Sequence, residues 1–216
     1  MLKNSFLFLE KISKKKEQNI WKQGIKNWDD FLKAASIRGI SKKSKFYYTQ
    51  KIKEAQQALL NDDSTYFINK LPQKDIWRIY PHFKEAAAYL DLEVDSYGKI
   101  ILVGISNYYQ TNTFVKYVNL EKEYLEQELK KYKLLITFNG SAFDLPKLKK
   151  QFQLEIKIPH LDLKPLCVKL KLNGGLKQIE RTLSLKRPKN LYGSPVELWK
   201  AFYASGDKEY LDLLIS

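Results

Sequence analysis

The sequence predicts an α/β fold in which a mixed five-stranded sheet is flanked by helices and preceded by a helical N-terminal segment. From Ala86 onward, short apolar runs separated by turns predict three strands that follow one another closely. Amphipathic segments then alternate with two further apolar runs, as expected of a sheet covered by helices. Residues 1–85, by contrast, are basic and show helix-capping patterns. We therefore expect a helical segment over 1–85 and an α/β domain over 86–216.

Helix caps and breaks divide the N-terminal segment. We expect one helix capped by Asn27, one capped by Ser41 that runs to about Leu60, and a short one between Pro72 and Pro81, where Pro81 ends it. The apolar positions of the second helix are expected to be Phe46, Ile52, Ala55, Ala58 and Leu59.

The second segment supplies the strands. They are expected at residues 86–94, 99–106, 113–118, 134–138 and 156–161. Helices are expected at residues 120–132, 142–152, 163–171, 176–183, 194–204 and from 207 to the end. Three strands, a helix, a strand, a helix and a strand follow one another in the order of the ribonuclease-H-like fold. The aromatic residues Trp199, Phe202 and Tyr203 lie at helical spacing and are expected to pack in the core, the alternative being a platform that stacks bases of a single strand.

The charge indicates the class of partner. The 216 residues include 38 Lys plus Arg and 24 Asp plus Glu, which gives a formal charge of +14. Such an excess favours a polyanion, most often nucleic acid, although a lysine-rich surface can also serve solubility alone. The excess is concentrated in residues 1–85, where Lys42, Lys43 and Lys45 are either phosphate contacts or solvated side chains.

Composition also excludes several classes of protein. No apolar run approaches the roughly 18 residues of a membrane span. One cysteine and two histidines exclude an intramolecular disulfide and disfavour a zinc site. We expect a soluble cytoplasmic protein with no membrane partner.

Two carboxylates stand out in the first predicted strand. Asp91 and Glu93 lie two residues apart, so their side chains share one face, about 6.5–7 Å apart. Like charges this close repel each other and resist burial. Either they lie on an exposed polar face, or a divalent cation such as Mg²⁺ or Mn²⁺ neutralises them.

A third carboxylate follows a later strand. In the stretch Phe138 to Pro146 a strand ends, Asn139-Gly140 turns the chain, and a helix begins. Asp144 can pair with Ser141 in a capping box, or lie beside the end of the first strand, or do both.

These motifs resemble those of a known family. In order, the chain contains Leu90-Asp91-Leu92-Glu93, Phe138-Asn139-Gly140-x-x-Phe143-Asp144-Leu145-Pro146, His160-Leu161-Asp162-Leu163 and Gly174-Gly175-Leu176-Lys177-x-Ile179-Glu180. Together they resemble the YprB-type ribonuclease-H-like exonuclease domain of the DEDD superfamily. That domain is similar to the proofreading 3′–5′ exonuclease domain of family B DNA polymerases. The resemblance covers about residues 86–216.

The resemblance implies an activity and roles for individual residues. It implies hydrolysis of DNA or RNA from a single-stranded 3′ end with two divalent cations, Mg²⁺ or Mn²⁺. Asp91 would contact both cations, Glu93 one and Asp144 the other. Asn139 and Phe143 would shape the pocket for the terminal nucleotide. Lys177, near the double glycine, is either a phosphate contact or a solvated side chain.

The fourth acid of the family is not evident. Asp207, in a Tyr-x-x-x-Asp spacing, and Asp212 are weak substitutes, and Asp162 is expected to cap a helix. The last helical pattern has no stop signal, so we expect that the chain is cut short before the final motif. Two alternatives to an active nuclease therefore remain: an impaired nucleic-acid-binding module or repair scaffold, and a structural unit that a partner completes.

Overall fold

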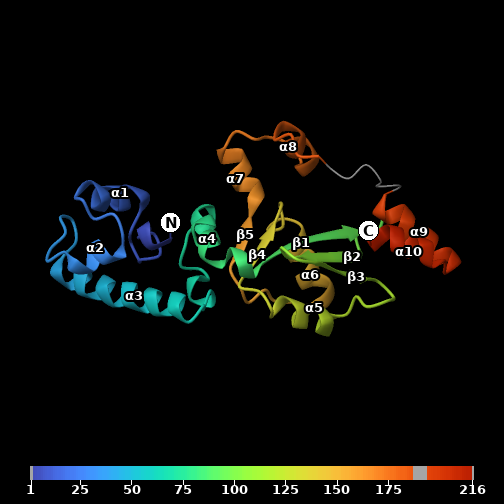
Figure 1. Cartoon of the computed structure of the whole chain (residues 1–216), viewed down its shortest axis with the longest axis horizontal. Helices are drawn as coiled ribbons and strands as arrows, with labels where there is room; N and C mark the ends of the chain where they lie inside the picture. The colour runs from blue at the N-terminus through green and yellow to red at the C-terminus, as the bar shows by residue number, and fades with distance from the viewer. Residues whose placement is uncertain (1, 187–193, 216) are drawn as a thin grey trace.

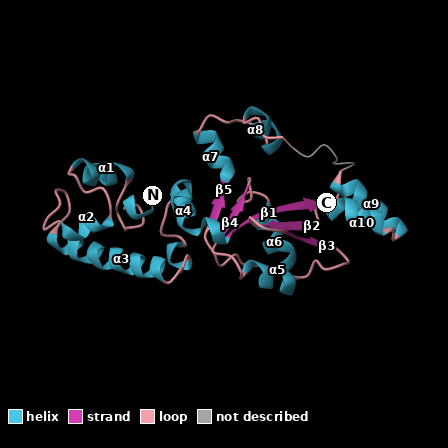
Figure 2. Ribbon diagram, in the orientation of Figure 1, coloured by secondary structure: helices cyan, strands magenta, loops and turns pink. Residues whose placement is uncertain are grey.

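The computed structural model describes residues 2–186 and 194–215, and a sheet lies in the middle of the elongated molecule (Figure 1). Its strands are β1 (Ala87–Val94), β2 (Ile100–Ser106), β3 (Thr111–Val115), β4 (Leu134–Thr137) and β5 (His160–Asp162). They lie in the order β3-β2-β1-β4-β5. β1 pairs antiparallel with β2, and β2 with β3, whereas β4 runs parallel to both β1 and β5. This mixed five-stranded sheet flanked by helices (Figure 2) confirms the predicted α/β fold.

Helices precede, connect and follow the strands. The α-helices are α1 (Lys14–Lys22), α2 (Trp28–Lys33), α3 (Lys42–Leu60), α4 (Tyr80–Phe83), α5 (Lys122–Leu129), α6 (Asp144–Phe152), α7 (Leu163–Lys169), α8 (Leu176–Thr182), α9 (Pro195–Ser205) and α10 (Lys208–Ile215). Short 3₁₀ helices lie at Leu2–Asn4, Thr65–Phe67, Gln73–Ile79 and Lys84–Ala86. Within the described ranges no helix combines the length and the apolar character needed to cross a membrane.

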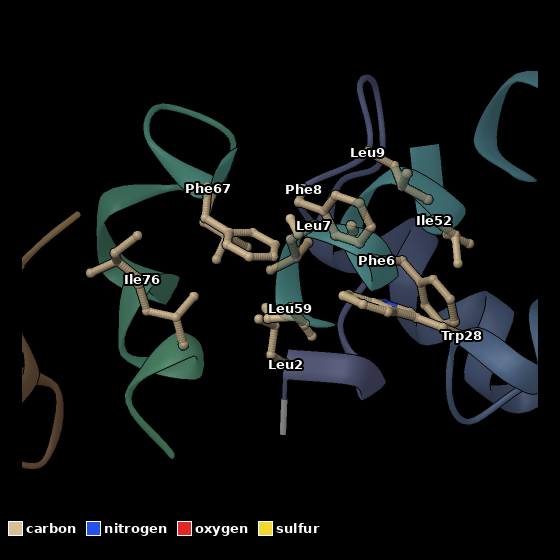
Figure 3. Close-up of a cluster of buried hydrophobic side chains, with 14 of the residues drawn as sticks. Leu2, Phe6, Leu7, Phe8, Leu9, Trp28, Ile52, Leu59, Phe67 and Ile76 are labelled. Atoms are coloured by element: carbon tan, nitrogen blue, oxygen red, sulfur yellow. The ribbon is translucent and has the colours of Figure 1, made fainter. Parts of the chain in front are cut away.

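The N-terminal helices share a hydrophobic core with the sheet. Phe6, Trp28 and Phe67 are fully buried in this cluster, with Phe8 beside them (Figure 3). The same cluster includes four side chains of the sheet, Ala87, Leu134, Ile136 and Leu161. The N-terminal segment therefore covers the β1–β4–β5 part of one sheet face. A division of the chain near residue 86 stays a prediction.

Two further clusters cover the rest of the sheet. On one face, α5 and α6 pack through Leu125, Leu129 and Leu148 against buried residues of β1 and β2. On the other face, α9 and α10 pack at the β2–β3 edge, where Trp199 contacts Ile101 and Val115. The N-terminal helices and α9–α10 therefore lie on the same face of the sheet, opposite α5 and α6.

Several predicted element boundaries were wrong. β3 spans Thr111–Val115 rather than 113–118, because Tyr117 has a left-handed φ of 68° that no strand residue adopts. β5 is three residues long and begins at His160. Helix α1, capped by Ser13, was not predicted, since its run of lysines hides the buried face that contains Ile20.

Two predictions within the N-terminal segment also need correction. Pro81 does not end a helix; it lies in the first turn of α4, where its missing N–H costs no hydrogen bond. Phe46 is 68% exposed, whereas Ile52, Ala55, Ala58 and Leu59 are buried as predicted. The caps provided by Asn27 and Ser41 are confirmed.

Candidate active site

β1 presents its carboxylates on one side of the sheet and its leucines on the other. Leu90 and Leu92 are buried against α5 and α6, whereas Asp91 is exposed and Glu93 half-buried on the opposite face. The alternation follows from the two-residue period of a strand, so the predicted placement of the two acids on one face is confirmed.

Small and polar residues surround Asp91 on this face. In the strand register Asp91 pairs with Gly104, and Gly104 pairs with Thr113. A side chain added at Gly104 would meet nothing nearer than the backbone oxygen of Asp91, at 4.0 Å. The next row of the sheet holds Ser106 and Thr111. The surface beside Asp91 is therefore open and polar.

Asp144 reaches this region from the neighbouring strand. Because β4 runs parallel to β1, the turn after β4 and the start of α6 lie beside the middle of β1. Asp144 is the first residue of α6 and its side chain is buried. The backbone of Leu92 forms a hydrogen bond that favours the charged form of Asp144. This contact places the carboxylate next to the strand that holds Asp91.

Asp91 interacts electrostatically with each of the other two carboxylates. Burial, followed by the charge of Asp91, raises the pKa of Asp144 to about 6. Burial, again followed by the charge of Asp91, raises the pKa of Glu93. Asp91 thus lies within electrostatic reach of both other acids. A positive charge between them would relieve both effects.

One oxygen of Asp144 lacks a hydrogen-bond partner. Asp144 Oδ1 is inaccessible to solvent and accepts no hydrogen bond. Leaving a buried carboxylate oxygen unsatisfied costs free energy, so such an atom is typical of a site that binds a cation or proton. The hard oxygen donors of Asp91, Glu93 and Asp144 fit Mg²⁺ or Mn²⁺. Within residues 2–186 and 194–215, however, no three His, Cys, Asp or Glu side chains are grouped closely enough to hold a metal ion. Cation binding therefore stays a prediction.

Asp162 fixes the turn that positions Asp144. Its carboxylate accepts hydrogen bonds from the backbone N–H groups of Asn139, Ser141 and Lys164, at 2.8, 3.1 and 3.0 Å. These bonds lower the pKa of Asp162 despite its burial. The bond from Lys164 caps α7, which confirms the predicted capping role. The predicted capping box of Ser141 and Asp144 was wrong, because Phe143 is the N-cap of α6 and makes no side-chain cap bond.

The same turn depends on Thr137 and Gly140. Thr137 Oγ1 accepts a hydrogen bond from the Gly140 N–H at 3.1 Å and bonds to His160 Nε2 at 2.9 Å. A Cβ atom at Gly140 would overlap the Thr137 side chain. His160 is thus a hydrogen-bonded structural residue, and Gly140 is required for the close approach of the two segments.

Gly140→Ala should lower the free energy of unfolding by about 1–3 kcal/mol, because the new methyl group displaces Thr137 from its hydrogen bonds. Chemical denaturation monitored by circular dichroism measures this change. The matched control is Gly104→Ala, since a Cβ atom there meets nothing nearer than the backbone oxygen of Asp91 at 4.0 Å. Equal stability of both variants would show that the Thr137 contact tolerates a side chain.

Other predicted site residues lie around the acids. Burial and the charge of Asp91 raise the pKa of Glu93. Lys177 of α8 is close enough to Glu93 that its positive charge partly offsets this increase. Phe143 is 38% exposed, and the ammonium of Lys147 lies 5.0 Å from the centre of its ring. Asn139 has a left-handed φ of 68° at the tip of the turn. The predicted roles of Asn139, Phe143 and Lys177 in binding nucleic acid stay predictions.

The lysines of the N-terminal segment do not join this site. Lys42 and Lys43 are exposed at the start of α3, at the end of the molecule farthest from the sheet (Figure 1). Lys45 is held against the protein instead, with its ammonium 4.7 Å from the centre of the Phe31 ring and 3.2 Å from Thr49 Oγ1. The predicted nucleic-acid contacts therefore fall into two separate regions.

The two candidates for a fourth acid lie at the start of α10 and within it. Asp207 follows the C-cap Gly206 of α9 and accepts the backbone N–H of Glu209 at 2.9 Å, at the start of α10. Asp212 is exposed on α10. Neither is among the causes of the raised pKa values of Glu93 and Asp144.

Sequence reasoning missed Tyr89 at this site. Tyr89 lies two residues before Asp91 on the same face, is 42% exposed, and its hydroxyl lies 3.3 Å from that of Tyr80. The alternation of Tyr89, Asp91 and Glu93 could have indicated it. The prediction that Tyr203 packs in the core was wrong, because its side chain is 63% exposed.

The strand order and the acidic face define a ribonuclease-H-like α/β protein, and comparison with protein families agrees. A model described as RNase_H superfamily matches residues 88–216, more than half of the chain, so the chain belongs to the RNase_H superfamily. A second model, described as a domain of unknown function (DUF8285), matches residues 4–125, which include the N-terminal helices and the first three strands. The search of curated proteins found no match.

Proposed function

We propose that the chain is a metal-dependent nuclease that removes nucleotides from the 3′ end of single-stranded DNA or RNA. The superfamily supports a nuclease-like domain that acts on nucleic acid. The observation that carries the finer proposal is the position of Asp91 between two acids whose pKa values it raises. The buried Asp144 oxygen without a hydrogen-bond partner, within electrostatic reach of Asp91, supports a role in cation binding.

In this proposal each residue of the candidate site has its own role. Asp91, Glu93 and Asp144 would hold divalent cations. When bound, Mg²⁺ or Mn²⁺ would activate water and stabilise the leaving oxygen of a phosphodiester. Asp162 and Thr137 keep the turn before Asp144 rigid, which fixes the position of its carboxylate. Phe143 and Asn139 would contact the terminal nucleotide, and Lys177 would contact a phosphate. Each turnover consumes one water and releases a mononucleotide.

Degradation of a labelled oligonucleotide tests this proposal. The purified chain is incubated with Mn²⁺ or Mg²⁺ and a linear single strand labelled at its 5′ end, and the products are separated by length. We expect a ladder that shortens from the 3′ end and that EDTA suppresses. A circular single strand should stay intact. Cleavage of the circle would contradict exonuclease action, and an intact linear strand would contradict hydrolysis altogether.

The second candidate function is a nucleic-acid-binding module without catalysis. It is favoured by the surroundings of Asp207 and Asp212, since neither joins the three acids. The formal charge of +14 supports binding in either case. Binding that weakens steeply with salt, without any cleavage in Mn²⁺, would support this second function.

Reversing two charges at the start of α3 should weaken binding only for long strands. α3 has 19 residues and is about 28 Å long, so Lys42 and Lys43 lie far from the acids. For Lys42→Glu combined with Lys43→Glu, we expect binding to a long oligonucleotide to depend less on salt than in the unmodified chain. The salt dependence of binding to a short oligonucleotide should be the same in both proteins. Fluorescence anisotropy at several salt concentrations measures this. An unchanged slope with the long strand would show that these lysines are only solvated.

A further inference from the structure

Three aromatic side chains at the β3 edge of the sheet form a near-parallel group, here termed the aromatic platform. The ring centroids of Tyr117 and Tyr203 lie 5.2 Å apart, and those of Trp199 and Tyr203 lie 5.4 Å apart. The corresponding interplanar angles are 27° and 10°. Trp199 is buried, whereas Tyr117 is 69% and Tyr203 63% exposed. Two large rings are therefore held in stacking geometry while they stay open to solvent.

The structure holds the platform in place from two elements. Trp199 packs against Ile101 and Val115 and so fixes α9 on the sheet. Tyr117 adopts a left-handed φ of 68°, which costs a non-glycine residue of the order of 1 kcal/mol. The backbone is therefore strained at the position where it places the Tyr117 ring against the rings of Trp199 and Tyr203. Strain of this kind often accompanies a binding function.

The platform lies on the same side of the sheet as the acids. Glu93 pairs with Leu102, and Leu102 pairs with Val115, two residues before Tyr117. With about 4.8 Å between strands, Glu93 and Val115 are about 10 Å apart. The ammonium of Lys116 lies 5.0 Å from the centre of the Tyr117 ring and 5.1 Å from that of Trp199. It also pairs with Asp95, two residues after Glu93, at 3.7 Å.

We propose that the aromatic platform stacks unpaired bases of the nucleic-acid strand whose 3′ end lies at Asp91. This inference rests on the proposed function and extends it to a subsite for the strand away from the reacting end. Bases have flat faces that stack on tyrosine irrespective of sequence, so the platform needs no particular base. A second copy of this chain is the weaker occupant, because two chains with a charge of +14 each repel one another.

Binding of a single-stranded oligonucleotide in EDTA tests the platform without cleavage. Tyr203→Ala should weaken binding about 5- to 150-fold, which corresponds to loss of one stacked base. Tyr203→Phe, which keeps the ring, should bind like the unmodified chain. Because stacking is not ionic, the salt dependence of binding should not change with Tyr203→Ala. An oligonucleotide that lacks its bases should bind both proteins equally.

The matched control is Tyr124→Ala. Tyr124 is 47% exposed on α5, which covers the opposite face of the sheet, and its loss should leave binding unchanged. Circular dichroism checks that each variant is folded. If Tyr203→Ala binds as tightly as the unmodified chain, the platform proposal is wrong while the proposed function stands. If the unmodified chain binds no single strand, both are wrong. If Tyr203→Ala only dissociates a dimer seen by gel filtration, the rings are a contact between copies and the proposal is overturned.

Discussion

Asp91→Ala should lower the rate of 3′-end cleavage at least about 100-fold and leave nucleic-acid binding nearly intact. Asp91 is the carboxylate whose charge reaches both Glu93 and Asp144, so its removal disrupts the cluster at its centre. Loss of charge stabilisation at a reacting phosphate typically costs two to three orders of magnitude or more in rate. The measurement is single-turnover degradation of a labelled strand in Mn²⁺, with anisotropy in EDTA for binding.

A surface carboxylate provides the control for Asp91. Glu123 is exposed on α5, on the opposite side of the sheet, so Glu123→Ala should cleave and bind like the unmodified chain. The two variants change formal charge by the same amount, which removes the general electrostatic effect from the comparison. Cleavage that survives in Asp91→Ala, or in Asp144→Ala, would show that the active site lies elsewhere.

The sequence predicts the sheet well because its signals are local. Alternation in β1 places Leu90 and Leu92 on one face and Asp91 and Glu93 on the other, and the structure has this arrangement. Two antiparallel steps give β3 the direction of β1, and α5 then connects β3 to β4. A strand that follows a helical crossover runs parallel, so β4 pairs in parallel with β1. Both features depend on residues that are neighbours along the chain or on simple connectivity.

The parts that could not be predicted depend on distant contacts. Asp162 holds the turn at Asn139 and Ser141, more than twenty residues earlier, and nothing in its local pattern indicates these partners. Tyr117 joins the rings of α9 only because Trp199 packs on β3. Lys45 is occupied by the Phe31 ring, which a run of lysines does not reveal. In each case tertiary packing, not local propensity, decides the role of the residue.

Asp144→Asn should abolish cleavage and yet raise the free energy of unfolding of the metal-free protein by about 1–3 kcal/mol at pH 7–8. Burial raises the pKa of Asp144 from 3.8 to about 6. A carboxyl group with a raised pKa in the folded state destabilises the fold progressively as the pH rises from 3.8 to 6, and fully above that. The position at the start of α6 favours a negative charge by about 0.3–1 kcal/mol, which is smaller than the cost of burial.

The pH dependence distinguishes this effect from a general change in packing. The stability advantage of Asp144→Asn should be small near pH 4, grow up to about pH 7 and then stay constant, because only the ionised carboxylate is costly. Glu123→Gln, on the exposed surface of α5, should show no such advantage. Mn²⁺ at pH 7.5 should raise the melting temperature of the unmodified chain but not of Asp144→Asn, since a cation that binds the folded state stabilises it. An asparagine variant less stable than the unmodified chain across this range would mean that Asp144 is a structural carboxylate, stabilised by its own contacts and not held for a cation.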